Sequence, residues 1–205
     1  MIRAARAAAI LVGLGSSGCF GSAPDLQYYQ LVPAVSAAPR APSELVIAVE
    51  PFEVDAAYDD ERIVYRPSPY RLSYYHYHRW SSTPGVQIAD FLRAAYERSG
   101  LFRQVGSDVD PGTRLLVSGR VSAFEEVDES ETSWVGRVRL DLLVRDVESG
   151  ELLLAQAIEE TEPLADQHPE GLARALSAAL SRVALRTAPL LVELAQRAER
   201  RAGAQ

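Results

Sequence analysis

The chain has 205 residues, of which 47% are hydrophobic and 24% are charged, and its formal net charge is -7. This length suits one domain with its own core better than two domains. The negative charge argues against nucleic-acid binding, which depends on Lys and Arg side chains that neutralise phosphates. No apolar run reaches the roughly 18 residues expected of a membrane-spanning helix.

The first residues have the pattern of an export signal. Arg3 and Arg6 precede the apolar segment 7–14, and the small residues at 15–18 lead to Cys19, which is the only cysteine. Exported proteins usually use their cysteines in pairs, and a single cysteine cannot form an internal disulfide. The segment resembles a bacterial lipoprotein signal, which implies cleavage before Cys19 and lipidation of that residue. An ordinary signal peptide followed by a free thiol, or a chance apolar start, are the alternatives.

We therefore predict a signal peptide over residues 1–18 and a tether rich in Pro and Ala over residues 19–43. Ser16 stands where lipoprotein signals usually carry Leu, so the processing of this signal stays open. Phe20 follows the cysteine in place of the Asp that typically retains lipoproteins in the inner membrane. The outer membrane is the predicted location, with the domain facing the periplasm. Within the tether, "DLQYYQL" at 25–31 is apolar enough to lie along the domain or a partner as an edge strand.

A single domain is predicted over residues 44–201, followed by a disordered tail at 202–205. Alternating apolar residues favour strands over 44–52, 62–66, 70–80, 101–107, 113–127 and 133–160, the last folded as a hairpin around residues 148–150. Helices are indicated after Thr83 and over 169–201, with Gly100 ending the first. The order of elements predicts an α+β (mixed α/β) fold, in which a single mixed sheet of about five to seven strands carries two main helices on one face.

Two single residues carry further structural predictions. Gly119 lies inside the strand predicted over 113–127, where a glycine indicates a bulge or a close approach of another part of the chain. Pro189 lies inside the helix predicted over 169–201 and should break or kink it, because proline removes a backbone hydrogen bond.

The segment "RIVYRPSPYRLSYYHYHRW" at 62–80 holds five of the nine tyrosines and one of the two tryptophans. Its prolines predict a hairpin turn, and alternation along 71–80 puts Leu72, Tyr74, His76, His78 and Trp80 on one face and Arg71, Ser73, Tyr75, Tyr77 and Arg79 on the other. Tyr, Trp and Arg are enriched at the centres of protein–protein contacts. We predict a partner-binding surface, and its expected anchors are Tyr65, Tyr70, Tyr74, Arg79 and Trp80. Which face is buried stays open, with Leu72 and Tyr74 expected to be core residues.

The same pattern speaks against catalysis and metal binding. His76 and His78 have the i, i+2 spacing of strand metal ligands, but no third ligand lies near them in the sequence. His168 precedes a helix, where a capping role explains it. The acidic residues of "EEVDESE" at 125–131 suggest a solvated hairpin tip. Nucleophile-elbow, P-loop and dinucleotide fingerprints do not occur, so we predict a protein that is not an enzyme and needs no metal or cofactor.

Several segments of the chain, taken in order, resemble a known family. The ordered set "YYQL", "LVIAVEPFEV", "RIVYR…YRLSYYHYHRW", "TPGVQIADFL" and "LLVSGRVSAFE" covers residues 28 to about 185. It is similar to the ABC-type transport auxiliary lipoproteins, the PqiC-like outer-membrane lipoproteins.

The resemblance implies a non-enzymatic, lipid-anchored periplasmic component of an ABC-type/MCE-domain lipid transport system. Such a protein would carry a diacylglycerol and an N-acyl chain on Cys19 as its only bound groups. It would dock an MCE-domain periplasmic protein and, through that protein, an inner-membrane permease. The alternative is a structural lipoprotein that scaffolds another envelope complex. The transported substrate, the direction of transport, lipid binding by the domain and self-association stay open.

Overall fold

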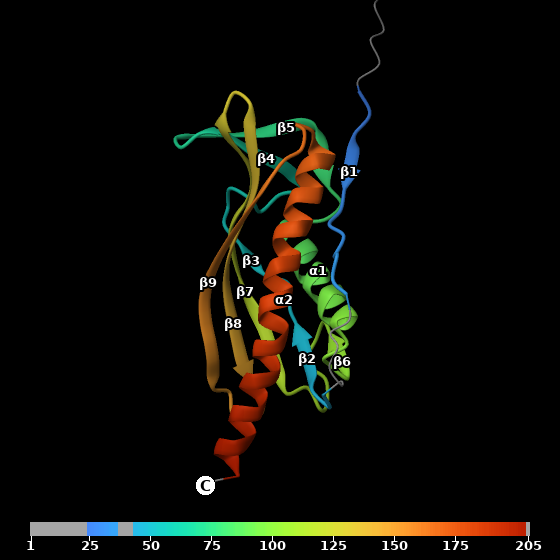
Figure 1. Cartoon of the computed structure of the whole chain (residues 1–205), viewed down its shortest axis with the longest axis vertical. Coiled ribbons are helices and arrows are strands. Elements are labelled where there is room, and N and C mark those ends of the chain that lie inside the picture. The colour runs from blue at the N-terminus through green and yellow to red at the C-terminus, as the bar shows by residue number, and fades with distance from the viewer. Residues whose placement is uncertain (1–23, 37–42, 204–205) are drawn as a thin grey trace, which may run out of the picture.

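The structure, a computed structural model, describes residues 24–36 and 43–203. Within these ranges the chain forms a mixed sheet of nine strands and two helices (Figure 1). The predicted α+β fold is confirmed, but the sheet is larger than the five to seven strands predicted. Three of its strands have only two or three residues, which is too short for an alternating pattern to show. The predicted signal peptide and Cys19 lie outside the described residues.

The strands are β1 (Gln27–Tyr29), β2 (Val46–Val49), β3 (Glu53–Val54), β4 (Arg62–Ser68), β5 (Arg71–Trp80), β6 (Gln104–Gly106), β7 (Leu115–Ser130), β8 (Ser133–Asp146) and β9 (Leu152–Pro163). The helices are α1 (Pro84–Ser99) and α2 (Pro169–Ala202). The predicted short strand within 101–107, the predicted helices and the hairpin around 148–150 are therefore all present.

The long strand β7 is the spine of the sheet. Along one edge it pairs antiparallel with β8, which pairs in turn with β9. Along its other edge it pairs successively with three parallel strands, β2, β3 and β4. Strand β6 extends the sheet beyond β2, while β5 and then β1 extend it beyond β4. The polar end of β7 therefore meets the Tyr-rich hairpin, and its apolar end meets β2.

Helix α1 begins and ends where the sequence predicts. Pro84 occupies the first helical turn, and Gly100 adopts the left-handed conformation, with φ of 67°, that terminates a helix at low cost. Thr83 is the N-cap residue by its backbone conformation, but its side chain makes no capping hydrogen bond. The helix buries an apolar side that includes Ile88 and Leu92.

Helix α2 runs without interruption through Pro189, so of the predicted break or kink the break does not occur. Proline removes only its own N–H from the helix ladder. Pro189 is half-buried and Leu185, whose carbonyl loses its partner, is 54% exposed, so water can reach this side of the helix. Ala188 and Leu191 are buried and hold the helix in place on either side of the proline.

The helices cover one face of the sheet, with α2 over β8 and β9 (Figure 1). By length and composition α2 could cross a membrane, but most of its apolar stretch is buried in this core. Gly119 confirms the predicted close approach, because a Cβ there would overlap the carbonyl oxygen of Asp141 and the ring of Phe52. The irregularity in β7 itself lies further on, between Val121 and Ala123.

Strand β9 is an edge of the sheet, and Arg182 of α2 is bound to it. The guanidinium group donates to the carboxylates of Glu160 and Glu162, at 2.8 and 2.6 Å, and to the carbonyl oxygen of Thr161 at 2.8 Å. Arg186 forms a second ion pair with Glu160 at 2.6 Å. Helix and strand are thus tied together by charges on their solvent-facing rim.

Candidate recognition surface

Residues 62–80 form a hairpin of β4 and β5, which we call the arm. Ser68 and Arg71 are paired across a turn made by Pro69 and Tyr70, so the predicted proline-containing hairpin is confirmed. The arm projects from the end of the molecule at which α2 begins (Figure 1). Tyr70 is 98% exposed at its turn, which makes it the most exposed large apolar side chain among those described.

A register shift bends β5 and changes which side chains lie together. Between the pairs Arg62–Arg79 and Val64–Tyr74, β5 advances five residues while β4 advances two. Alternation therefore fails across this shift. Tyr75 and His78, which alternation places on opposite faces, are in edge contact with ring centroids 5.7 Å apart. The predicted two-face pattern of β5 is wrong for this reason.

Trp80 is a core residue and offers no surface to a partner. Its side chain is fully buried, and its ring centroid lies 4.9 Å from that of Phe124 in β7. The prediction that Trp80 is a contact anchor needs correction, because the strand passes into the core before reaching it. Trp80 is the last residue of β5, so its side chain packs the base of the arm against β7.

Tyr65, Tyr74 and Arg79 are half-buried and shape the arm from within. Tyr74 donates a hydrogen bond to the carbonyl oxygen of Ala57 at 3.2 Å, and the Arg62 guanidinium lies 4.0 Å above its ring. Arg79 donates to the carbonyl oxygens of Tyr75 and His78, at 2.9 and 3.0 Å, within the bent segment.

The free apolar surface of the arm lies elsewhere, at Tyr70 and at Tyr77, which is 45% exposed. Tyr77 was not among the predicted anchors. The bend in β5 that exposes it leaves no mark in the alternating sequence.

A fully buried carboxylate, that of Glu125, fixes the position of the arm on the sheet. It accepts hydrogen bonds from the Tyr58 hydroxyl at 2.9 Å and from Arg66 Nε at 3.1 Å, and Arg137 of β8 forms a further ion pair with it. Arg66 belongs to β4, so this cluster joins the arm to β7 and β8. Burial and the charge of Glu125 raise the pKa of Tyr58 to about 12, so its hydroxyl remains a donor.

The interpretation of residues 125–131 as a solvated tip is therefore wrong for its first two residues. Strand β7 continues to Ser130, and both Glu125 and Glu126 are fully buried inside it. The partners of Glu125 come from 67 and 59 positions before it and from 12 positions after it. The only sign of this burial in the sequence is that the two glutamates directly follow an apolar strand pattern.

Glu126 occupies a different environment from its neighbour. Its carboxylate accepts hydrogen bonds from the Tyr75 hydroxyl at 3.1 Å and from Gln167 Nε2 at 3.3 Å. Burial raises the pKa of Glu126, while these two hydrogen bonds oppose the rise. Burial and the charge of Glu126 likewise raise the pKa of Tyr75. A buried, hydrogen-bonded cluster whose donors are uncharged thus joins β5 to β7 and Gln167.

A histidine pair lies where the arm meets the first turn of α2. The Tyr29 hydroxyl is 2.9 Å from His78 Nδ1, and the rings of His78 and His168 are 6.2 Å apart. His168 confirms its predicted capping role by accepting a hydrogen bond from the backbone N–H of Glu170 at 3.3 Å. Burial, His168 and Arg79 lower the pKa of His78. Within the described ranges no three His, Cys, Asp or Glu side chains are placed to hold a metal.

The segment 24–36, which we call the strap, runs alongside both helices (Figure 1). Its backbone N–H groups at Val32 and Ala34 donate to the hydroxyls of Ser177 and Ser181 in α2, at 3.1 and 3.2 Å. The residues "DLQYYQL" thus lie along the domain as predicted, and β1 is their edge strand. Of the tether predicted over 19–43, residues 24–36 are seated on the domain.

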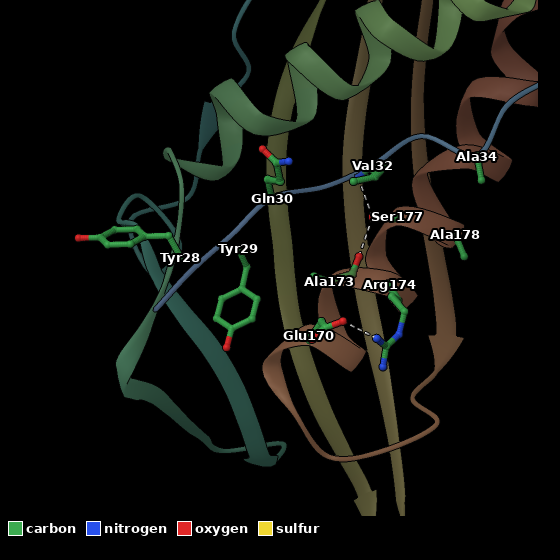
Figure 2. Close-up of a pocket in the computed structure, with 10 residues that line it drawn as sticks. All are labelled: Tyr28, Tyr29, Gln30, Val32, Ala34, Glu170, Ala173, Arg174, Ser177 and Ala178. Carbon is green, nitrogen blue, oxygen red and sulfur yellow. Dashed lines mark hydrogen bonds and ion pairs between the residues drawn. The ribbon is translucent and has the colours of Figure 1, made fainter. Parts of the chain in front are cut away.

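A groove of about 570 Å³ lies between the strap and the first turns of α2 (Figure 2). The strap contributes Tyr28, Tyr29 and Val32, and α2 contributes mainly small residues. Arg174 lies in the groove and pairs with Glu170 at 2.8 Å. The groove is thus apolar at its sides, and its exposed arginine is already neutralised.

The fold and this surface define a two-layer α+β domain with a projecting aromatic arm and an N-terminal strap seated on its helices. The chain belongs to the family of ABC-type transport auxiliary lipoprotein components, whose model matches residues 29–188. The family confirms the resemblance seen in the sequence and identifies a lipoprotein associated with ABC-type transport.

Solved structures show the same fold. The chain is similar to a protein from Xanthomonas campestris, with a TM-score of 0.74 and 18% identity over 85% of this chain and 99% of the other. An uncharacterized protein matches with a TM-score of 0.66 and 14% identity, over 82% and 99% of the two chains. No curated protein sequence matches this chain significantly.

Proposed function

We propose that this protein is a non-enzymatic, lipid-anchored component of an ABC-type/MCE-domain lipid transport system. It sits at the outer membrane with its domain in the periplasm and docks an MCE-domain protein that leads to an inner-membrane permease. Membership of the transport auxiliary family supports the transport role. The exposed aromatic arm supports the docking role.

The observation that carries the docking role is the contrast between the arm's rigid base and its free turn. Glu125 is fully buried between the guanidinium groups of Arg66 and Arg137 at the base. Tyr70 stands almost fully exposed at the turn. A tyrosine side chain has only two rotatable χ angles, so it loses little conformational entropy when a partner buries it, and tyrosine is favoured at the centres of interfaces.

Anchoring is proposed at Cys19 through a diacylglycerol and an N-acyl chain, because stable attachment needs more than one chain. Expression of wild type and Cys19→Ser in a host that processes lipoproteins tests this, with intact mass and membrane flotation as readouts. Wild type should carry the acyl mass and float with membranes, whereas Cys19→Ser should do neither. A wild-type chain without acyl mass would contradict the anchor.

Docking is tested with the Tyr70→Ala/Tyr77→Ala double variant, which removes the two exposed tyrosines of the arm. Leu185→Ala is the matched control, because Leu185 is 54% exposed on α2, away from the arm. Cross-linking in the native envelope followed by mass spectrometry should recover an MCE-domain protein with wild type and the control, and at least about tenfold less with the double variant. Equal recovery would contradict docking through the arm, and recovery only of unrelated envelope proteins would favour the scaffold alternative.

A further inference from the structure

The strap is held by three elements of the domain at once. Its strand β1 pairs with β5, and its N–H groups bind two serines of α2. From α1, Arg98 donates to the carbonyl oxygen of Pro33 at 2.7 Å, and Pro33 is buried. Leu31 and Val35 pack against the hydrophobic core. The segment therefore behaves as part of the fold and not as a free linker.

The two serines of α2 are suited to this role. Ser177 and Ser181 each donate to a backbone carbonyl of α2 one turn earlier, at 2.6 and 2.8 Å. This hydrogen bond fixes each hydroxyl, so that its remaining lone pairs point to the strap and accept the N–H groups of Val32 and Ala34. Four residues along a helix and two residues along an extended chain both span about 6 Å. The two hydroxyls of α2 are therefore spaced like the two N–H groups of the strap.

The seated strap shortens the chain available for anchoring. Cys19 precedes the first described residue, Pro24, by five positions. Five residues span at most about 18 Å when fully extended, whereas a free tether from Cys19 to Ser43 would span up to about 80 Å. The anchor therefore holds the domain close to its bilayer only if the strap stays seated.

The strap also selects which end of the molecule lies near the anchor. The strap begins at the end that carries the arm and the turn between β7 and β8 (Figure 1). The turn between β8 and β9 lies at the opposite end (Figure 1). These two turns are separated by the length of β8, whose 14 residues span about 46 Å.

We propose that the strap fixes the distance and the orientation of the domain on its bilayer, so that the end bearing the arm faces the lipid surface. This rests on the proposed lipid anchor at Cys19. The bilayer is thus a second surface that the domain meets, and the arm is presented to its partner beside the membrane. The β8–β9 turn points away into the periplasm.

Energy transfer to a lipid-bound acceptor tests the orientation. The lipidated full chain is reconstituted in phosphatidylethanolamine–phosphatidylglycerol vesicles, with a donor on Thr132→Cys in the β7–β8 turn or on Ser149→Cys in the β8–β9 turn. Each introduced cysteine is the only free thiol once Cys19 is acylated. Transfer from position 132 should be at least about twice that from position 149, given the length of β8. Equal transfer from both positions would overturn the proposed orientation.

A matched pair of insertions tests the strap itself. Six Gly/Ser residues are inserted either between Cys19 and Pro24 or, as the control, within residues 37–42, after the strap. With the strap seated, the first insertion should lower transfer from position 132 and the second should leave it unchanged. A free tether responds equally to both insertions because it is lengthened equally, and that result would overturn the proposal. Circular dichroism checks that both variants are folded.

Flotation separates this inference from the proposed anchor. A wild-type chain that fails to float, or a Cys19→Ser variant that floats equally well, overturns the anchor and the inference with it. A wild-type chain that floats, but responds equally to both insertions, overturns the strap inference alone.

Discussion

Glu125 and Glu126 are adjacent in β7 and both fully buried, yet their carboxylates have opposite surroundings. That of Glu125 lies between the guanidinium groups of Arg66 and Arg137. That of Glu126 accepts hydrogen bonds only from the neutral groups of Tyr75 and Gln167. The first carboxylate therefore has two cationic partners, whereas the second has none among these contacts, and burial raises its pKa.

Replacement of Glu125 should destabilise the fold. Glu125→Gln leaves two half-buried guanidinium groups without this counter-charge, so we expect the free energy of unfolding at pH 7 to fall by about 2 kcal/mol. Urea denaturation followed by circular dichroism measures this change. A loss below about 0.5 kcal/mol would show that the ion pairs do not hold the base of the arm.

Glu126→Gln is the matched variant, and we expect the opposite outcome. The pKa of Glu126 is raised in the folded state, so its unfolded form ionises first as pH rises. Wild-type stability should therefore include a component that is lost as pH rises from about 4.5 through the folded pKa. The variant should lose this component and be at least as stable as wild type at pH 7. Urea denaturation at pH 5 and pH 7 measures how the free energy of unfolding changes with pH in wild type and in the variant.

The turn of the arm and the last residue of β5 should respond differently to truncation. Trp80 is fully buried against Phe124, so Trp80→Ala should lower the free energy of unfolding by about 3–5 kcal/mol. Tyr70 is almost fully exposed, so Tyr70→Ala should leave the melting temperature unchanged within error. Differential scanning calorimetry of both variants checks this pair. A marked loss of stability in Tyr70→Ala would mean that the turn is packed against another surface.

Gly119 should tolerate no larger side chain. A Cβ at this position overlaps a backbone oxygen in β8 and the ring of Phe52, so Gly119→Ala should cost about 2 kcal/mol or more. Ser118→Ala on the same strand is the control and should change stability by less than about 1 kcal/mol. Thermal unfolding measures both. Equal stability of the two variants would contradict the close contact between β7 and β8.

The contacts that hold the strap on the domain should weaken as pH falls. The pKa of His78 is lowered in the folded state, so the unfolded or detached histidine protonates first as pH falls below about 6.5. The rings of Tyr75 and His168, the Tyr29 hydroxyl and the charge of Arg79 surround it. Hydrogen exchange at the N–H groups of Val32 and Ala34, corrected for intrinsic rates, should speed up between pH 7.5 and pH 5.5.

His78→Gln is the control for this pH dependence, because Gln can still meet the Tyr29 hydroxyl but carries no titrating group. Its exchange rates at the strap should be the same at both pH values after correction. A pH response that survives in this variant would assign the effect to another group, with His168 the nearest.

Elements with strong local signals were predictable from the sequence. Helix α1 has a proline at its start and a glycine in the left-handed conformation at its end, and both act through the local backbone. The β8–β9 hairpin shows apolar alternation on both sides of its Ser149–Gly150 turn. The tight position of Gly119 was also foreseeable, since glycine inside a strand costs stability unless something approaches closely.

The site depended on contacts between distant parts of the chain and could not be predicted in the same way. Burial of Glu125 requires Arg66 and Arg137 to arrive from two other strands. Burial of Trp80 follows from the bend in β5, which shifts the register without a glycine or proline to mark it. The continuous helix at Pro189 follows from packing on the sheet, which overrides the local preference of proline.

The link between Arg182 and β9 also bears on how these molecules behave when crowded. Lipoproteins on one membrane are confined to two dimensions, where open sheet edges meet often and can zip together into aggregates. Arg182 occupies a backbone carbonyl of the outermost strand, and the charges of Glu160 and Glu162 line the same rim. Around Thr161 this edge is therefore blocked to strand addition, which disfavours polymerisation of crowded molecules through this end of β9.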